Sequence, residues 1–180
     1  MAYYGNSCTT LPEHYCDPCG AIEQGRVRGI ALIDENYYPT LLADPSNHLL
    51  WLAGINQNLI TIVPFVNGEV ADPSRIDVPG VGSQIKRFVG YNNVANIVDP
   101  NYASNVVFWN RAKQANNRVF AYTTENYVHF SGNTVYISPS NPVQNDITSL
   151  VEIKVTVEWA SKDMPVPYTI PTGIFECPPA

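Results

Sequence analysis

The chain has 180 residues, of which 45% are hydrophobic and only 14% are charged, and its formal net charge is −6. This length suffices for one domain with a buried core that needs neither a metal ion nor disulfides to fold. The acidic balance argues against a protein that holds nucleic acid by neutralising phosphates, so we expect no specific binding of DNA.

Asn, Pro, Gly and Tyr replace the missing charged residues, since a typical chain is about one quarter charged. This composition is typical of β-rich proteins with long ordered connections. It is also typical of surfaces that other subunits cover, because interfaces lose charge and gain aromatic residues.

The first eight residues, MAYYGNSC, contain no basic segment followed by an apolar one, and no apolar run approaches membrane-spanning length. We therefore expect a protein that is made in the cytosol, stays soluble and has no membrane partner. Residues 1–24 are rich in turn formers and hold three of the four cysteines. They are predicted to form an N-terminal arm with little regular structure.

Residues 25–33 alternate and then become apolar on both faces, which predicts a strand with a buried second half. Asp44 and Pro45 mark the start of a helix that runs to about Asn56 and places Leu49, Leu52 and Ile55 on one face. The β-branched segment 58–65 predicts a second strand. Residues 66–82 are predicted to be a long loop, which in a compact domain usually serves function or interaction.

Residues 83–99 predict one long strand with a bulge or bend at Gly90. Asp99 and Pro100 then open a second helix, over about residues 101–115, that is amphipathic through Val106 and Trp109. Residues 118–138 contain three strand-like pieces with breaks at 124–126 and 131–133. The second break, Ser-Gly-Asn, is a strong hairpin signal.

The clearest pattern is LVEIKVTVEWA, residues 150–160, in which apolar and polar residues alternate strictly. This alternation predicts a long strand with one buried and one wet face. The wet face carries Glu152, Lys154, Thr156 and Glu158. Five prolines between residues 165 and 179 forbid a central strand, so the C-terminus is predicted to be an extended tail.

Together these elements predict a mainly β (α+β) fold. It would be an antiparallel β-sandwich or open barrel with one or two flanking helices, extended N- and C-terminal arms and a long loop. The predicted division is a Cys-rich arm at 1–24, the sandwich or barrel domain at 25–164 and a Pro-rich tail at 165–180.

The cysteines Cys8, Cys16, Cys19 and Cys177 allow two interpretations. Two thiolates spaced C-x2-C converge from a turn on one metal ion, and Cys8 and Cys177, or His14 in place of one ligand, could complete a closed structural zinc site. The alternative is unpaired thiols in a docked arm, or disulfides formed after release from the cell. A thioredoxin-like role is disfavoured because no strand and helix frame the pair.

No motif predicts catalysis or a cofactor other than that zinc ion. The histidines His14, His48 and His129 stand outside the known hydrolase motifs. Glu152 and Glu158 share the wet face of one strand, which favours a solvated or subunit-facing surface over a glycosidase pair. The segment GVGSQIKRF lacks the ending of a phosphate loop. We therefore expect a protein that is not an enzyme.

Several segments in order are similar to small virion structural proteins of tailed phages and prophages of Bacteroidetes bacteria. They are GRVRGIALI, WLAGINQNLITIVPFVNGE, GVGSQIKRFVGYNN, DPNYASNVVFWN and VEWASKDMPVPYTIPTGIF, and they span nearly the whole chain. The element order also resembles the tail-tube fold, in which a β-sandwich or open barrel with a flanking helix builds stacked hexameric rings. In that fold long hairpins line a lumen, while a long loop and terminal arms join one ring to the next.

The resemblance implies a virion protein that assembles with copies of itself and with other virion proteins, most simply as the tail tube. The strand face of Glu152, Lys154, Thr156 and Glu158 would then face the lumen or a neighbouring subunit, and DNA would only pass through. The basic residues Lys86, Arg87, Arg111, Lys113 and Arg118 and the Cys-rich arm depart from this pattern. They leave a capsid auxiliary, decoration or head-to-tail connector protein as the alternative.

Overall fold

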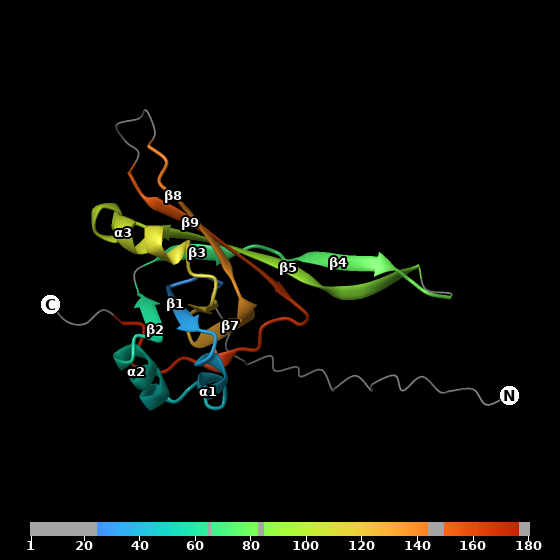
Figure 1. Cartoon of the computed structure of the whole chain (residues 1–180), viewed down its shortest axis with the longest axis horizontal. Helices are drawn as coiled ribbons and strands as arrows, with labels where there is room; N and C mark the ends of the chain where they lie inside the picture. Colours follow the sequence, from blue (N-terminus) through green and yellow to red (C-terminus); the bar gives the residue numbers. More distant parts are fainter. Residues whose placement is uncertain (1–24, 65, 83–84, 144–149, 177–180) are drawn as a thin grey trace, which may run out of the picture.

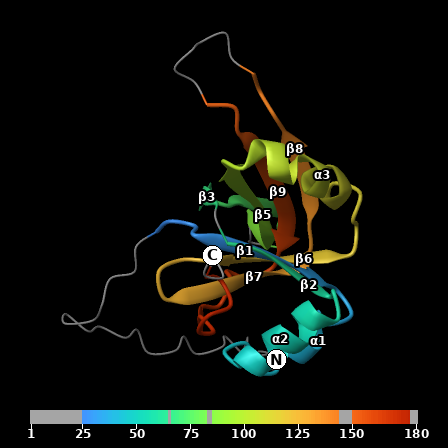
Figure 2. The same ribbon diagram turned by 90° about the vertical axis from the view of Figure 1, so that its left-hand side faces the viewer.

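A computed structural model describes residues 25–64, 66–82, 85–143 and 150–176 of the chain. The fold is mainly antiparallel β, with two sheets and three helices in the described part, as the sequence predicts (Figure 1). The first sheet has the strand order β10-β7-β6-β1-β2, and the second has the order β3-β5-β9-β8, with β4 also paired to β5. Figure 2 shows the two sheets as layers, with α1 and α2 against the outer side of the first sheet.

The first sheet is built on β1 (Gly29–Asp34), which pairs with β2 (Ile60–Val63) on one side and β6 (Arg118–Thr123) on the other. β7 (Tyr127–Thr134) follows β6, and the short β10 (Tyr168–Thr169) pairs with β7 at the edge. β1 is buried from Gly29 to Ile33, because helices cover one face and the second sheet covers the other. This confirms the strand whose second half is apolar on both faces.

The second sheet is built on β5 (Lys86–Asp99), a strand of 14 residues. β9 (Ile153–Ser161) pairs with its second half, from Tyr91 to Asp99, and β8 (Tyr136–Ser140) pairs with β9. Ile153, Val155, Val157 and Trp159 are buried while Lys154 and Glu158 are exposed, which confirms the predicted buried and wet faces.

The long loop predicted for residues 66–82 is wrong. This segment contains β3 (Asn67–Val70) and β4 (Ser74–Pro79), which lie along the two halves of β5. The length of β5 lets one strand serve two successive partners. Because β3 and β4 are exposed or half-buried edge strands, they need little alternation of apolar and polar residues, and the sequence shows it only at Ile76 and Val78.

The hairpin predicted at residues 131–133 is also wrong. The chain turns at the first break instead, between β6 and β7, and Ser131, Gly132 and Asn133 lie inside β7. Gly132 has φ +75°, and the register against β6 shifts there because the Ser131 hydroxyl accepts the Phe120 N–H at 3.1 Å. The glycine therefore serves a bulge, not a turn.

The three helices are α1 (Tyr38–Leu42), α2 (His48–Asn56) and α3 (Tyr102–Ala112). α1 was not predicted, because one buried residue in five, Leu41, leaves no periodic pattern. α2 begins after Asn47, whose side chain accepts the Leu49 N–H at 3.0 Å, so Asn47 replaces Asp44 as the N-cap.

α2 buries Trp51 and Gly54, not the predicted face of Leu49, Leu52 and Ile55. Leu49 is 67% exposed. Gly54 is needed there, since a Cβ at this position would lie 2.5 Å from Ile60 Cδ1. The helix therefore packs through a large aromatic ring beside a point of close approach.

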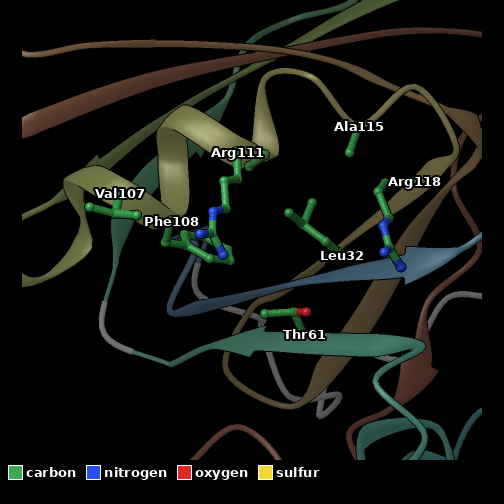
Figure 3. A pocket seen from close by; sticks show the side chains of 8 residues that line it. Leu32, Thr61, Val107, Phe108, Arg111, Ala115 and Arg118 are labelled. Atoms are coloured by element: carbon green, nitrogen blue, oxygen red, sulfur yellow. The ribbon is translucent and has the colours of Figure 1, made fainter.

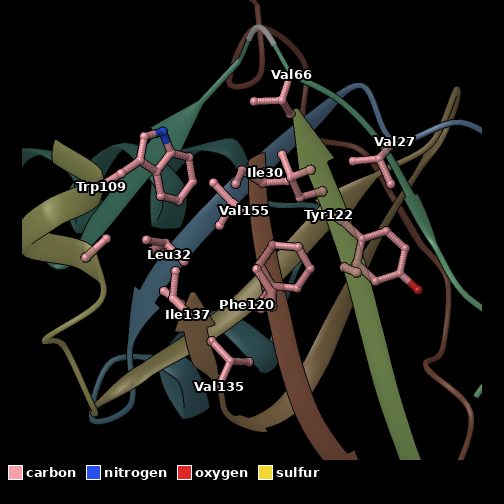
Figure 4. Close-up of a cluster of buried hydrophobic side chains, with 14 of the residues drawn as sticks. Val27, Ile30, Leu32, Val66, Trp109, Phe120, Tyr122, Val135, Ile137 and Val155 are labelled. Atoms are coloured by element: carbon pink, nitrogen blue, oxygen red, sulfur yellow. The ribbon is translucent and has the colours of Figure 1, made fainter. Parts of the chain in front are cut away.

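The main core lies between the sheets, and α3 closes one end of it with Trp109 and Ala112 (Figure 4). The second cluster lies between the first sheet and α1 and α2. Phe130, Trp51 and Phe175 form a chain of ring contacts there, with centroids 6.1 Å and 5.2 Å apart. Because Ile174 and Phe175 pack in this cluster, part of the predicted tail is docked on the domain.

Tyr122 lies at the edge of the main core, and burial raises the pKa of its hydroxyl from 10.0 to about 12. The unfolded chain therefore loses this proton at a lower pH than the folded chain does. The contribution of Tyr122 to stability is complete below pH 10 and is lost as the pH rises toward 12, by about 2 kcal/mol. Urea unfolding of wild type and Tyr122→Phe at pH 9 and pH 11.5 checks this, because the variant should lose less stability between the two.

Candidate functional site

The four cysteines Cys8, Cys16, Cys19 and Cys177, and His14, lie outside the described residues. The zinc site therefore stays a prediction. Within the described part of the chain, no group of three or more His, Cys, Asp and Glu side chains is placed to hold a metal ion. None of the three described helices is long and apolar enough to cross a membrane.

The predicted polar face of β9 lies on the outer side of the second sheet, away from the core. Lys154 and Glu158 are exposed, Thr156 is half-buried, and Glu152 lies one residue before the strand, also half-buried. Whether this face lines a lumen remains a prediction.

Neighbouring strands extend the polar character of this face. Thr156 lies opposite Asn96 of β5 and Ser138 of β8, so three neighbouring positions in one row are uncharged and can form hydrogen bonds. Glu69 of β3, opposite Asn96, ends this row with a charge. Glu158 lies in the next row on the same face, opposite Val94 and Tyr136. The face therefore offers hydrogen bonds along its length and only scattered charges.

A shallow hollow of about 490 Å³ opens on this face, beside Glu158. Behind it, the Asn93 side chain donates to the Ser161 hydroxyl at 2.8 Å and to the Trp159 carbonyl at 3.3 Å. Of the residues that line the hollow, Glu158 alone is charged. The lining residues are Ser74, Asn92, Asn93, Val94, Glu158, Trp159 and Ala160.

The most unusual surface is the hairpin of β4 and the first half of β5. Figure 1 shows it projecting from the body on the side away from α3. β9 pairs with β5 only from Tyr91 onward, so residues Lys86 to Gly90 have β4 as their partner among the described strands. This part is a two-stranded ribbon, which is marginally stable in water without further support.

Local contacts hold the base of the ribbon in shape. The Arg75 side chain makes an ion pair with Asp77, with Nε and Oδ1 2.7 Å apart, and its guanidinium lies 4.9 Å from the centre of the Phe88 ring. The register shifts between Ile76 and Asp77, opposite the segment that ends at Gly90. The irregularity predicted at Gly90 is thereby confirmed, and it twists the ribbon where it leaves the sheet.

The tip of the hairpin exposes apolar side chains. Val81 is 80% exposed and Ile85 is 89% exposed, and Val78 and Val89 are exposed lower on the ribbon. The Gly80 N–H donates to the Ile85 carbonyl at 3.2 Å, which brings the two sides of the tip together. We call residues 74–82 and 85–89 the projecting hairpin. An ordered ribbon that presents apolar side chains to solvent is typical of an interaction site.

The projecting hairpin is also basic. Arg75, Lys86 and Arg87 outnumber Asp77, so it carries a net charge of about +2 on a chain whose total is −6. Lys86 and Arg87 stand out as a basic pair in the sequence, whereas the hairpin that carries them was not predicted. The sequence does contain one indication of this hairpin. The dipeptide Pro79-Gly80 is typical of a turn, and it lies between two segments that can form paired strands.

Comparison with known proteins found no matching family model, no matching curated protein and no matching solved structure.

Proposed function

We propose that this chain is a non-enzymatic structural protein of a tailed-phage virion, and that copies of it assemble into rings or a tube, most simply the tail tube. The observation that carries the assembly is the projecting hairpin, with Val81 and Ile85 exposed at the tip of a two-stranded ribbon. The virion setting rests on the resemblance of the quoted segments to phage structural proteins.

The charge of the hairpin supports a head-to-tail contact between copies. A basic hairpin does not pair favourably with another basic hairpin, whereas the rest of the chain is acidic. A contact between two different surfaces repeats from copy to copy and produces a ring if the rotation closes, or a filament if it does not. This is the symmetry that a ring or tube requires.

The outer face of the second sheet fits the inner wall of such an assembly. Its hydrogen-bonding rows of Thr156, Asn96 and Ser138 and its scattered charges at Lys154 and Glu158 offer DNA no continuous basic surface. DNA would therefore pass without being held. In this proposal the partners are copies of the chain and other virion proteins.

Sedimentation of the purified chain over a range of concentrations tests the proposal. We expect the average mass to rise with concentration from one copy to a closed multiple or an open series. A chain that stays a monomer up to millimolar concentration would exclude self-assembly. In that case binding to a capsid lattice, tested by co-sedimentation with capsids, would favour the decoration protein.

A further inference from the structure

A cleft opens at the side of the sandwich, between α3 and the β1–β2 edge of the first sheet (Figure 3). Its volume is about 420 Å³, within the range of sites that bind ligands. The buried side chains of Leu32 and Ala112 lie at its base, and Val107, which is 60% exposed, lies at its rim. The whole lining is Leu32, Thr61, Val107, Phe108, Arg111, Ala112, Ala115 and Arg118.

Two arginines from different elements reach this apolar cleft, Arg111 from α3 and Arg118 from the start of β6. Arg118 is partly neutralised, since its Nη1 lies 3.7 Å from Asp34 Oδ2 and 3.4 Å from the Leu59 carbonyl. Arg111 has no ion-pair partner in the part of the chain that the structure describes. The cleft therefore keeps about one positive charge beside an apolar floor.

This combination fits a peptide segment that carries a carboxylate next to an apolar side chain. The guanidinium group binds carboxylates through two parallel hydrogen bonds, and the floor removes the neighbouring apolar group from water. The projecting hairpin of a neighbouring copy does not fit, because Lys86 and Arg87 would face Arg111 and Arg118.

We propose that the cleft binds residues 1–24 of a neighbouring copy, an inference that rests on the proposed self-assembly. This segment contains Glu13, Asp17 and Glu23 and neither lysine nor arginine. Its carboxylates stand close to aromatic and apolar residues in the sequence, as Tyr15 lies two residues after Glu13 and Ile22 directly precedes Glu23. Fully extended, 24 residues span up to about 80 Å, enough to reach a neighbour's cleft.

A labelled peptide of residues 1–24 tests this directly, in reducing buffer and at a chain concentration below that of assembly. We expect it to bind the full-length wild-type chain, and Arg111→Glu to weaken the binding at least tenfold. Lys113→Glu is the matched control, because it makes the same change on the exposed side of the same helix region and does not line the cleft. It should leave the affinity within about twofold.

A charge exchange distinguishes contact from a loss of structure. A peptide with Glu13→Arg, Asp17→Arg and Glu23→Arg should bind wild type poorly and bind the Arg111→Glu chain better than the natural peptide does. Equal binding to wild type and to Arg111→Glu would overturn the proposal. Absence of peptide binding would overturn it as well, including where residues 1–24 of the same chain already fill the cleft. Binding by a chain that never assembles would overturn self-assembly and leave the cleft assignment intact.

Discussion

Asp99→Ala should lower the free energy of unfolding by about 3 kcal/mol, because it leaves one buried and two partly buried donors without their acceptor. The Asp99 side chain is fully buried at the junction of β5 and α3. Its carboxylate accepts the Trp109 indole N–H at 2.9 Å, the Asn105 amide at 2.8 Å and the Asn101 backbone N–H at 2.9 Å. One side chain thus joins the end of the longest strand to the helix that closes the core.

Two further variants sharpen this prediction. Asp99→Asn keeps one side-chain oxygen as an acceptor and should lose about half as much stability. That oxygen can accept the Asn101 N–H or the Trp109 N–H, but it cannot replace both carboxylate oxygens for all three donors. Asp77→Ala, which removes a carboxylate from a surface ion pair with Arg75, should cost less than about 1 kcal/mol. Urea unfolding measures all three, and an Asp99→Ala chain as stable as the Asp77→Ala chain would refute the role of Asp99.

The double change Val81→Asp/Ile85→Asp should abolish assembly of the chain while leaving the monomer folded. Burying a valine and an isoleucine in a neighbour is worth about 3 kcal/mol, or more than about a hundredfold in the concentration at which copies associate. Both side chains are at least 80% exposed, so replacing them should change the stability of the monomer very little.

A matched pair of changes controls for a general effect of added charge. Leu49→Asp/Val166→Asp replaces two exposed apolar residues, 67% and 58% exposed, outside the projecting hairpin. We expect this variant to assemble as wild type does, as measured by sedimentation, while circular dichroism shows both variants folded. Assembly of the Val81→Asp/Ile85→Asp chain at wild-type concentrations would remove the hairpin from the interface.

The elements with strong internal patterns were predictable from the sequence. β9 alternates over its whole length because one face packs in the core and the other meets water, and α3 shows Val106 and Trp109 on one side for the same reason. β1 was predicted because a strand that is covered on both faces is a continuous run of apolar residues, which can be recognised without any alternation.

The errors concern elements whose partners are distant in the sequence. β3 and β4 form strands because β5 is long enough to pair with both of them, one after the other. Their own residues, such as Gly68 and Asp77, have little strand preference. Gly132 looks like a turn residue, and only its pairing with β6 makes it part of a bulge. In α2 the prediction followed the leucines, whereas packing against the first sheet selected Trp51.

The candidate site follows the same division. The polar face of Lys154, Thr156 and Glu158 could be read from alternation within one strand. The projecting hairpin could not, since its exposure depends on where β9 stops pairing with β5, at Tyr91. The cleft needed the structure as well, because Arg111 and Arg118 flank it only when α3 lies over the β1–β2 edge.

The central claim is that copies of this chain assemble head to tail through the projecting hairpin. Negative-stain electron microscopy of the purified wild-type chain at high concentration, beside the Val81→Asp/Ile85→Asp variant, tests it most directly. We predict hollow rings or stacked tubes for wild type and isolated small particles for the variant. Small particles alone for wild type, or the same rings for both, would contradict the claim.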